Sequence, residues 1–343
     1  MPTAITNPQV SKAAVHNKSV ARIEPLDWTK GTLVLFMVVY HAINYSIFRP
    51  LSFRYLSFLP PSFVMIAGLV VGSVYAARYD TGSWKPYVRL MVRGIKLLLI
   101  FVALNLGLYI LRERDLIGGF MEFTDRAGMI FLSGNGREGI FEVLLPIAYF
   151  LLLAPLLLWL RSRAAAVIPI CTLALFILCV VLEKQGMYSL NLALLSAGTI
   201  GMAFGLIPIE TIDRHARKWL PVLGAYALYR LCSYYWGEIY AIQMFGAAVS
   251  VFLLYTCALH LNMSAWTGRQ MILLGRYSLL GYLLQIGFLQ VMLKVAGGKS
   301  EHWVSVIAVG VLASVLLFLA VNLVDFLRRR HRPVDLIYKG VFA

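Results

Sequence analysis

The sequence predicts an all-α, polytopic membrane protein with about ten transmembrane helices and with both termini in the cytoplasm. Its 343 residues are 60% hydrophobic and only 14% charged, which is far more apolar than a soluble domain. Apolar runs of about 20 residues, the length of a helix that crosses a bilayer, recur along the whole chain. The Lys and Arg residues are also distributed unevenly between the connections that separate these runs.

Ten candidate spans lie between polar breaks, at approximately 31–48, 58–77, 88–111, 139–159, 164–182, 189–209, 218–236, 239–260, 271–293 and 302–327. If the N-terminus is cytoplasmic, the inner connections hold most of the 31 Lys and Arg residues, as the positive-inside rule requires. The same distribution accounts for the net charge of +15, so the basic composition does not indicate nucleic acid as a partner.

The domain organisation follows from these spans. We expect residues 1–21 to be a disordered cytoplasmic tail, 22–332 a single transmembrane domain and 333–343 a second cytoplasmic tail. The first tail lacks the apolar core of a secretory signal. The longest outer connection, residues 112–138, has the mixed composition of a short interfacial helix. The glycine pairs Gly68 with Gly72 and Gly201 with Gly205 are typical of close helix packing.

The first span carries polar residues on one face. In "LDWTKGTLVLFMVVYH" the step from Lys30 to His41 turns a helix by about 1100°, which leaves the two residues about 20° apart and about 16 Å apart along the axis. Asp27 and Asn44 lie about 40° and 60° from this stripe. This geometry suits a donor molecule with an anionic head near Lys30 and a long arm that ends at His41.

Two interpretations of His41 are open. It could form a hydrogen bond to a neighbouring helix, as buried histidines in soluble proteins do. Inside lipid, however, an ionisable side chain is costly and is by default a functional candidate. Because histidine is also suited to proton transfer, we favour His41, with Asn44, as the catalytic residues.

The same segment resembles the opening helix of the membrane-bound acyltransferase 3 superfamily, which includes glucan-modifying acyltransferases and the heparan-alpha-glucosaminide N-acetyltransferase type. Members typically show "LD" and then an Arg, ten residues and a His. Here Leu26 and Asp27 precede Lys30 and His41, and Lys30 replaces the Arg without its bidentate fork. The segments "FVMIAGLVVGSVYAAR" (63–78) and "VRGIKLLLIFVALN" (92–105) resemble the second and third helices of the superfamily.

The resemblance implies transfer of an acyl group, acetyl or succinyl, from cytoplasmic acyl-CoA to a hydroxyl of an extracytoplasmic glycan or glycolipid. His41 would be the general base, and Asn44 or Asn105 would orient the ring or stabilise the oxyanion; a covalent acyl-histidine is the alternative. It also implies a multi-pass protein of the plasma membrane. Acyl-CoA is a co-substrate here, and we expect no tightly bound cofactor and no metal, because no metal-binding spacing occurs in the sequence.

Candidate binding residues follow from their positions along the spans. For the donor they are Lys30, Asp27, Arg89 and Arg93, although ordinary positive-inside bias also explains the two arginines. For the acceptor they are Asn105, Glu142, Arg230 and Gln285 in the outer half, where each could instead be a packed polar group. Glu142 and Arg230 could pair with each other or contact sugar hydroxyls. Tyr234, Tyr235 and Trp236 are better explained as an interfacial aromatic belt.

Two rival functions remain. A secondary transporter or flippase would also place polar groups at similar depth, although no internal repeat supports it. A non-catalytic scaffold would not need His41. The expected partners are therefore acyl-CoA, an extracytoplasmic carbohydrate and the lipid bilayer, without nucleic acid, and the sequence leaves a homodimer open.

Overall fold

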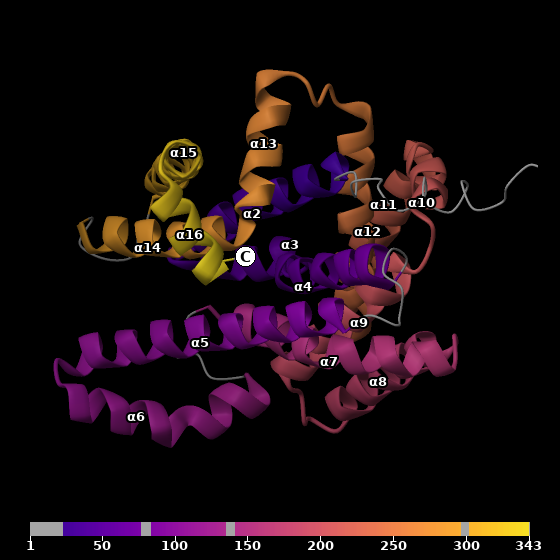
Figure 1. The fold of residues 1–343 in the computed structure, drawn as a ribbon, viewed down its shortest axis with the longest axis horizontal. Coiled ribbons are helices and arrows are strands. Elements are labelled where there is room, and N and C mark those ends of the chain that lie inside the picture. Colours follow the sequence, from indigo (N-terminus) through magenta and orange to yellow (C-terminus); the bar gives the residue numbers. More distant parts are fainter. Residues whose placement is uncertain (1–22, 77–83, 135–140, 296–301, 343) are drawn as a thin grey trace, which may run out of the picture.

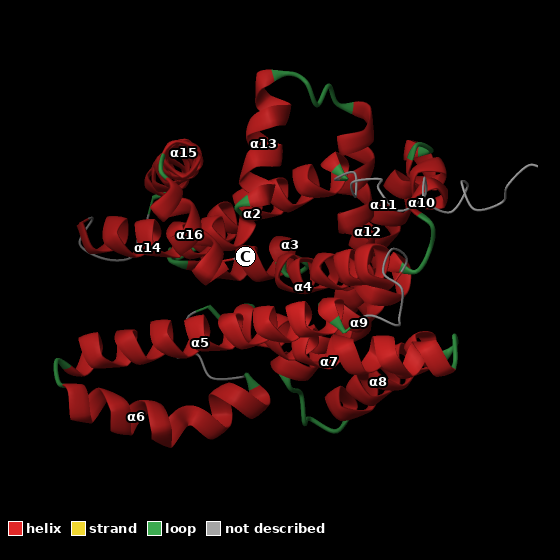
Figure 2. Ribbon diagram, viewed as in Figure 1, coloured by secondary structure: helices red, strands yellow, loops and turns green. Residues whose placement is uncertain are grey.

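The computed structural model describes residues 23–76, 84–134, 141–295 and 302–342 (Figure 1). These residues form helices joined by short loops, without a β-strand among them (Figure 2). The predicted all-α class is confirmed for this part of the chain. Seven of its helices are long and apolar enough to cross a membrane, and a bent pair would make an eighth.

In chain order the helices are α2 (Glu24–Asn44), α3 (Arg49–Leu56), α4 (Leu59–Val70), η1 (Val71–Ala76), α5 (Lys85–Glu113), α6 (Leu116–Gly128), η2 (Met129–Ser133), α7 (Leu144–Arg163), α8 (Val167–Lys184), α9 (Leu190–Gly205), α10 (Ile209–Ala216), α11 (Trp219–Trp236), α12 (Tyr240–His260), α13 (Trp266–Arg276), α14 (Ser278–Val295), α15 (Trp303–Arg330) and α16 (Arg332–Phe342).

Local chemistry explains several helix starts. The first turn of α2 holds Pro25, whose missing N–H costs nothing there, and Glu24 and Asp27, which suit the positive end of the helix dipole. Asp115 caps α6 by accepting a hydrogen bond from the backbone N–H of Gly118, with a donor-to-acceptor distance of 2.7 Å. These signals are local, so the sequence predicts the existence of these helices well.

Small residues bring the helix backbones together. α4 packs closely against α9, and a Cβ atom added to Gly68 would overlap the Gly198 carbonyl oxygen. In the same way a Cβ on Gly72 would lie 2.8 Å from Gly205 Cα, and one on Gly201 would overlap the Met65 carbonyl. The predicted role of these glycines in close helix packing is confirmed, because only glycine allows this approach.

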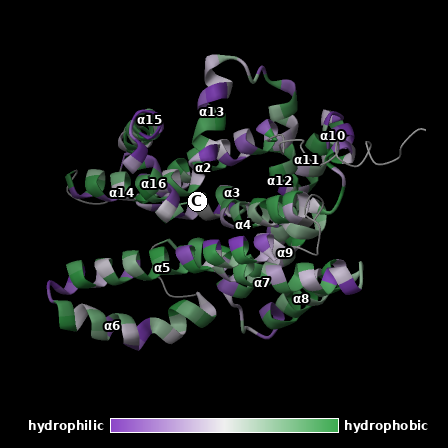
Figure 3. Ribbon diagram, viewed as in Figure 1, coloured by the Kyte–Doolittle hydropathy of each residue, from purple (hydrophilic) through white to green (hydrophobic). Residues whose placement is uncertain are grey.

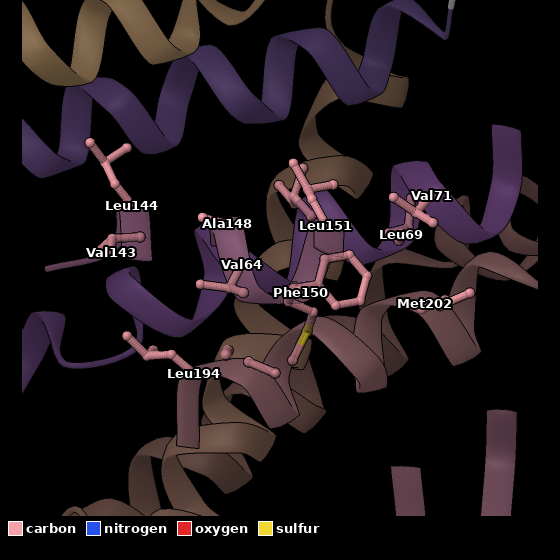
Figure 4. Packing of buried hydrophobic residues seen from close by; sticks show 14 of the residues in the cluster. Val64, Leu69, Val71, Val143, Leu144, Ala148, Phe150, Leu151, Leu194 and Met202 are labelled. Carbon is pink, nitrogen blue, oxygen red and sulfur yellow. The ribbon is translucent and has the colours of Figure 1, made fainter. Parts of the chain in front are cut away.

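The core between α4, α7 and α9 is filled by aliphatic side chains around Phe150, which is fully buried (Figure 4). Its ring packs against Gly198 of α9. Because lipid tails are as apolar as these side chains, van der Waals contact rather than hydrophobic transfer stabilises such an interface.

Most of the helices are rich in hydrophobic residues, which are green in the ribbon of Figure 3. Of the most apolar 18-residue window of α8 only 11% is buried, and of that of α15 only 22%. Apolar helix faces of this extent are expected where lipid covers the protein. The helices are not all parallel: in Figure 1 α15 is seen nearly end-on, whereas α5 and α14 run across the view.

One prediction about the elements needs correction, the single span 271–293, whereas the count of ten spans and the two cytoplasmic tails are not confirmed. The expected ten spans exceed the seven or eight that meet the length and apolarity of a span, because α2 and α11 carry too many polar and aromatic residues. The expected span 271–293 is two helices, α13 and α14, which are broken at Tyr277. The expected tail 333–343 lies in helix α16 up to Phe342. The predicted tail 1–21 lies outside the described residues.

The predicted helix in the connection 112–138 is confirmed as α6, which packs beside α5. The span 189–209 corresponds to α9, which continues after a bend of 97° as α10. The sides of the membrane on which the termini lie stay predictions.

Candidate functional site

His41 lies in the last turn of α2, where the chain turns toward α3. Its ring stacks on that of Tyr45 with centroids 5.9 Å apart, and it meets the ring of Tyr40 edge-on at 5.1 Å. Both ring nitrogens are buried, and neither has a hydrogen-bond partner among the described residues. The alternative of a hydrogen bond to a neighbouring helix is therefore not formed in this part of the chain. A buried polar group without a partner calls for an explanation such as water or a ligand.

Two amide side chains also have buried polar atoms without a hydrogen-bond partner among the described residues. Asn44 lies three residues after His41, and its Oδ1 atom is buried without a partner within the described ranges. Gln285 of α14 is fully buried, and neither its Oε1 nor its Nε2 atom finds a partner there. Each such group costs about 1–3 kcal/mol if it stays dry and unpaired.

Two contacts show that Gln285 lies alongside the last turns of α2. A Cβ atom on Gly281 of α14 would lie 3.2 Å from Val34 Cγ1 of α2. Nine residues further along α14, the Gln290 side chain hydrogen-bonds the Tyr45 hydroxyl at the end of α2. The two helices therefore run side by side in the same direction, with Gln285 between these contacts.

Glu142 adds a carboxyl group to the same region. It lies in the turn before α7, outside the apolar helix, and interacts electrostatically with Tyr40, Tyr45 and Arg49. Burial raises the pKa of Glu142 to about 7, and the Arg49 guanidinium opposes this rise. Near neutral pH this carboxyl group can therefore either donate or accept a hydrogen bond.

The backbone next to Glu142 is strained. Phe141 has a φ angle of 69°, in the left-handed region that bulky side chains rarely adopt. Its buried ring packs edge-on against Tyr282 of α14, with centroids 6.1 Å apart. Strained residues of this kind cluster at functional sites, where the surrounding structure holds them in place.

The residues His41, Asn44, Tyr45, Glu142 and Gln285 are called the His41 cluster below. The structure thus brings together the two predicted catalytic residues and two of the four predicted acceptor residues. The cluster offers an imidazole that can take up a proton, amide groups that can donate to an oxyanion, and a carboxyl group. It contains the parts that acyl transfer to a hydroxyl requires.

The other two predicted acceptor residues have hydrogen bonds to backbone oxygens outside the cluster. The Asn105 amide donates to the Phe101 carbonyl of its own helix at 3.0 Å, and this helix, α5, packs mainly against α6 and α7. Arg230 of α11 donates through Nη2 to the backbone oxygen of Arg54 at 3.3 Å. The predicted pairing of Glu142 with Arg230 is not formed between these two described residues, because Glu142 faces Arg49 instead.

At the opposite end of α2, Lys30 and Asp27 form an ion pair with an Nζ to Oδ1 distance of 2.7 Å. The Asp27 side chain is only 4% exposed, whereas that of Lys30 is 22% exposed. This end of α2 crosses α13 so closely that a Cβ atom on Gly275 would overlap the Asp27 carbonyl oxygen. The predicted donor-binding residues Lys30 and Asp27 thus form a fixed, partly buried ion pair, with the ammonium group nearer to water.

Arg89 and Arg93 lie one turn apart on an exposed face near the start of α5. The Arg93 Nη1 atom donates to the Tyr75 hydroxyl in η1 at 3.2 Å. One turn on, Lys96 donates to the backbone oxygen of Lys339 in α16 at 3.1 Å. The predicted donor arginines therefore lie where α5, η1 and α16 meet.

Sequence reasoning missed the aromatic and basic neighbours of the cluster. Tyr45 follows His41 at the i+4 spacing that places two side chains on one helix face, so this spacing could have identified it. Tyr282 precedes Gln285 by three residues and could have been found in the same way. No local signal connects Arg49 with Glu142, since these residues meet only in the folded chain.

Comparison with known proteins identifies no relative. No family model matches the sequence, and no curated protein or solved structure matches it either. The function is therefore inferred from the residues of the chain itself.

Proposed function

We propose that this protein is a plasma-membrane acyltransferase that moves an acetyl or succinyl group from cytoplasmic acyl-CoA to a hydroxyl of an extracytoplasmic glycan or glycolipid. The observation that supports this most is the buried His41 imidazole, whose two nitrogens have no partner in the described structure. Its ring contacts Tyr40 and Tyr45, and both of these interact with the Glu142 carboxyl group. In a helix bundle that is otherwise apolar, such a histidine is retained for a function.

In the proposed reaction the neutral His41 imidazole removes the proton from the acceptor hydroxyl. The hydroxyl oxygen attacks the thioester carbonyl carbon, and the amides of Asn44 or Gln285 donate to the oxyanion that forms. The carbon–sulfur bond then breaks, and the CoA sulfur receives the proton held by His41. The products are the acyl ester and free CoA, so that atoms and charges balance.

The length of α2 separates the two substrates. Lys30 and His41 are 11 residues apart in a continuous helix, which corresponds to about 16 Å. An acyl-CoA arm that enters near Lys30 would reach His41 along this path, while the acceptor approaches from the other end. The exposed Arg89 and Arg93 would contact the phosphates of CoA.

In the variant mechanism His41 is itself acylated before the acceptor arrives. Both mechanisms need an unpartnered ring nitrogen. They differ in kinetics, because only an acyl-histidine predicts a burst of CoA release in the absence of acceptor.

A transporter remains the alternative from another class. The bend between α9 and α10 could suggest a broken span of the kind that transporters use. However, α10 carries Glu210, Asp213, Arg214 and His215 within eight residues, which is typical of a helix at the membrane surface. The bend is better explained as the end of a span.

The experiment compares release of free CoA thiol from acetyl-CoA and succinyl-CoA, with a disaccharide present as the acceptor, by the purified wild type and by the His41→Ala and His41→Gln variants. We expect both variants to lose at least about a hundredfold in rate, as removal of a general base does. Their CoA affinity should be unchanged, and their melting temperatures should fall by only a few degrees, since His41 loses ring contacts but no hydrogen bond within the described residues.

His260→Ala is the matched control. The Nδ1 atom of His260 already interacts with the Thr256 carbonyl oxygen of its own helix at 2.8 Å, so its loss should leave the rate unchanged. If the wild type neither binds nor consumes acyl-CoA, or if His41→Ala is as active as the wild type, the proposal is wrong.

A further inference from the structure

A second polar site lies beside the His41 cluster. A groove of about 650 Å³ opens between α3 and the turn that joins α11 to α12. Pro50 lines the groove, and its chain neighbour Arg49 interacts electrostatically with Glu142 of the His41 cluster. Of the first two residues of α3, one thus interacts with each site.

Two arginines define the charge of the groove. The guanidinium groups of Arg54 and Arg230 lie over the same ring, that of Tyr55, at 5.8 and 5.2 Å from its centroid. The Arg230 Nη1 atom is buried and has no hydrogen-bond partner in the described part of the chain. Neither arginine forms an ion pair with a carboxylate there. Two cations held together without a directly paired counter-ion form a binding site for an anion.

The single carboxylate in the groove is held by other partners. Glu238 accepts hydrogen bonds from the hydroxyls of Ser57, at 2.6 Å, and of Ser233. Its backbone oxygen accepts a further bond from the Gln243 side chain at 3.0 Å. Glu238 is therefore fixed in place and forms no direct ion pair with either arginine among the described residues, so two guanidinium groups share the groove with one carboxylate. Its remaining lone pairs can accept hydrogen bonds from hydroxyl groups.

An aromatic wall completes the groove. Tyr234 lines the groove, and this residue is 69% exposed. The Arg54 guanidinium lies 5.9 Å from the centroid of the Tyr234 ring. An exposed ring beside fixed polar groups suits the apolar face of a sugar, whereas a membrane belt alone would not need Glu238 or the two arginines.

We infer that this groove binds a sugar with an anionic substituent, a carboxylate or a phosphate, through Arg54 and Arg230. The ring of Tyr234 stacks on the sugar, and Glu238 and Gln243 accept hydrogen bonds from its hydroxyls. The identity of this ligand as the acceptor rests on the proposed acyl transfer; the binding itself does not.

The test measures binding of three probes to the full chain in phosphatidylcholine nanodiscs by saturation-transfer NMR: a glucuronate disaccharide, glucose 6-phosphate and neutral cellobiose. We expect at least one acidic probe to bind tenfold or more tightly than cellobiose and to weaken with added salt. Tighter binding of the glucuronate disaccharide indicates a carboxylate ligand, and tighter binding of glucose 6-phosphate indicates a phosphate ligand. Arg54→Gln and Arg230→Gln should each reduce this affinity about tenfold, the loss of about one charge-assisted hydrogen bond.

The control variant is Arg112→Gln, which removes one exposed cation at the end of α5 and should leave binding unchanged. Arg54→Lys keeps the positive charge and should retain part of the affinity. Because Arg54 is exposed, its variants should fold normally, so they test the inference even if the partly buried Arg230→Gln variant misfolds. Equal binding of acidic and neutral probes, no binding at all, or unchanged binding in both arginine variants would overturn the inference.

Acyl-CoA consumption measured on the same samples separates this inference from the proposed function. His41-dependent CoA release without preference for acidic sugars refutes only the groove inference. Arginine-dependent binding without any acyl-CoA consumption refutes only the acyltransferase.

Discussion

The rings of His41 and Tyr45 stack across one turn of α2, with centroids 5.9 Å apart and planes inclined by 23°. Tyr45 is in turn held by the side chain of Gln290 in α14. The orientation of the histidine ring thus depends on a second helix. Because stacked aromatic pairs contribute about 0.5–1.5 kcal/mol, this contact can select one ring position among several.

Removing the Tyr45 ring should reduce catalysis without unfolding the protein. We expect Tyr45→Leu to lower the rate of acyl-CoA turnover by roughly tenfold, because the His41 ring is no longer held in position. This corresponds to a rise of about 1.4 kcal/mol in the activation free energy. Tyr45→Phe keeps the stacked ring and should lose less than about threefold. Steady-state kinetics with a melting temperature for each variant checks this. Equal rates for Leu, Phe and wild type would show that the stack does not position His41.

The crossing of α2 and α13 should not tolerate a methyl group. A Cβ atom on Gly275 overlaps the Asp27 carbonyl oxygen, and one on Gly31 overlaps the Met271 carbonyl oxygen. Backbone atoms cannot move aside as a flexible side chain can, so Gly275→Ala should destabilise the protein by about 1–3 kcal/mol. Thermal unfolding in detergent measures the effect as a lower melting temperature.

Gly287→Ala in α14 is the matched control, because no atom lies within 4 Å of a Cβ at that position. It should be neutral or slightly stabilising, since alanine has the higher helix propensity. If Gly275→Ala melts at the same temperature as Gly287→Ala, the close crossing is not present.

Glu142 should make stability depend on pH. Its folded-state pKa is about 7, above the ordinary value of 4.5, so the charged form is disfavoured in the folded protein. The penalty is absent below about pH 4.5, grows as the pH rises and is complete above about pH 7; one pKa unit corresponds to about 1.4 kcal/mol. We expect Glu142→Gln to melt a few degrees above wild type at pH 8 and at the same temperature at pH 5.

Melting curves of both proteins at five pH values between 5 and 9 check this sign. A variant that melts below the wild type at pH 8 would mean that the charged carboxylate is stabilising, as a tight ion pair with Arg49 would require.

Asp335 should hold α16 onto α15. The Arg328 Nε and Nη2 atoms donate to Asp335 Oδ1 at 3.0 and 2.7 Å, and Arg328 lies 3.8 Å from the centroid of the Tyr338 ring. Lys339 and Arg328 also hold the pKa of the Asp335 carboxyl below its usual value. Asp335→Asn should therefore speed chymotrypsin cleavage within α16 several-fold, as followed by mass spectrometry.

Glu122→Gln, which breaks the partly buried pair with Arg126 on α6, serves as a control and should leave cleavage in α16 unchanged, because this pair shares no residue with the ion pairs of Asp335. An unchanged cleavage rate in Asp335→Asn would show that the ion pair does not retain the helix.

The sequence predicts well those features that depend on local pattern. The helix of residues 24–44, the paired glycines of α4 and α9 and the helix after Glu113 follow from apolar runs, spacing and capping residues. The candidate role of His41 came from its position alone. These features need no knowledge of distant contacts.

The remaining features depend on residues far apart in the chain. The run 271–293 looks continuous, yet it breaks at Tyr277, whose hydroxyl donates to Asp325 and accepts from Arg328, both at 2.9 Å. Those partners lie 48 and 51 residues away. The interaction of Glu142 with Arg49 has the same character, so the sequence alone cannot choose among a pairing with Arg230, a contact with sugar hydroxyls and this arginine.

The most direct measurement of the central claim is acyl transfer across a sealed membrane by the purified protein. Acyl-CoA, which does not cross the bilayer, is added outside vesicles that enclose an acidic disaccharide and its neutral counterpart. Wild-type protein should acylate sugar inside the vesicles, and His41→Ala should not, although it still binds CoA. Enclosed product formed equally well by His41→Ala, or acylation restricted to sugar outside the vesicles, would contradict the assignment of His41 to transmembrane acyl transfer.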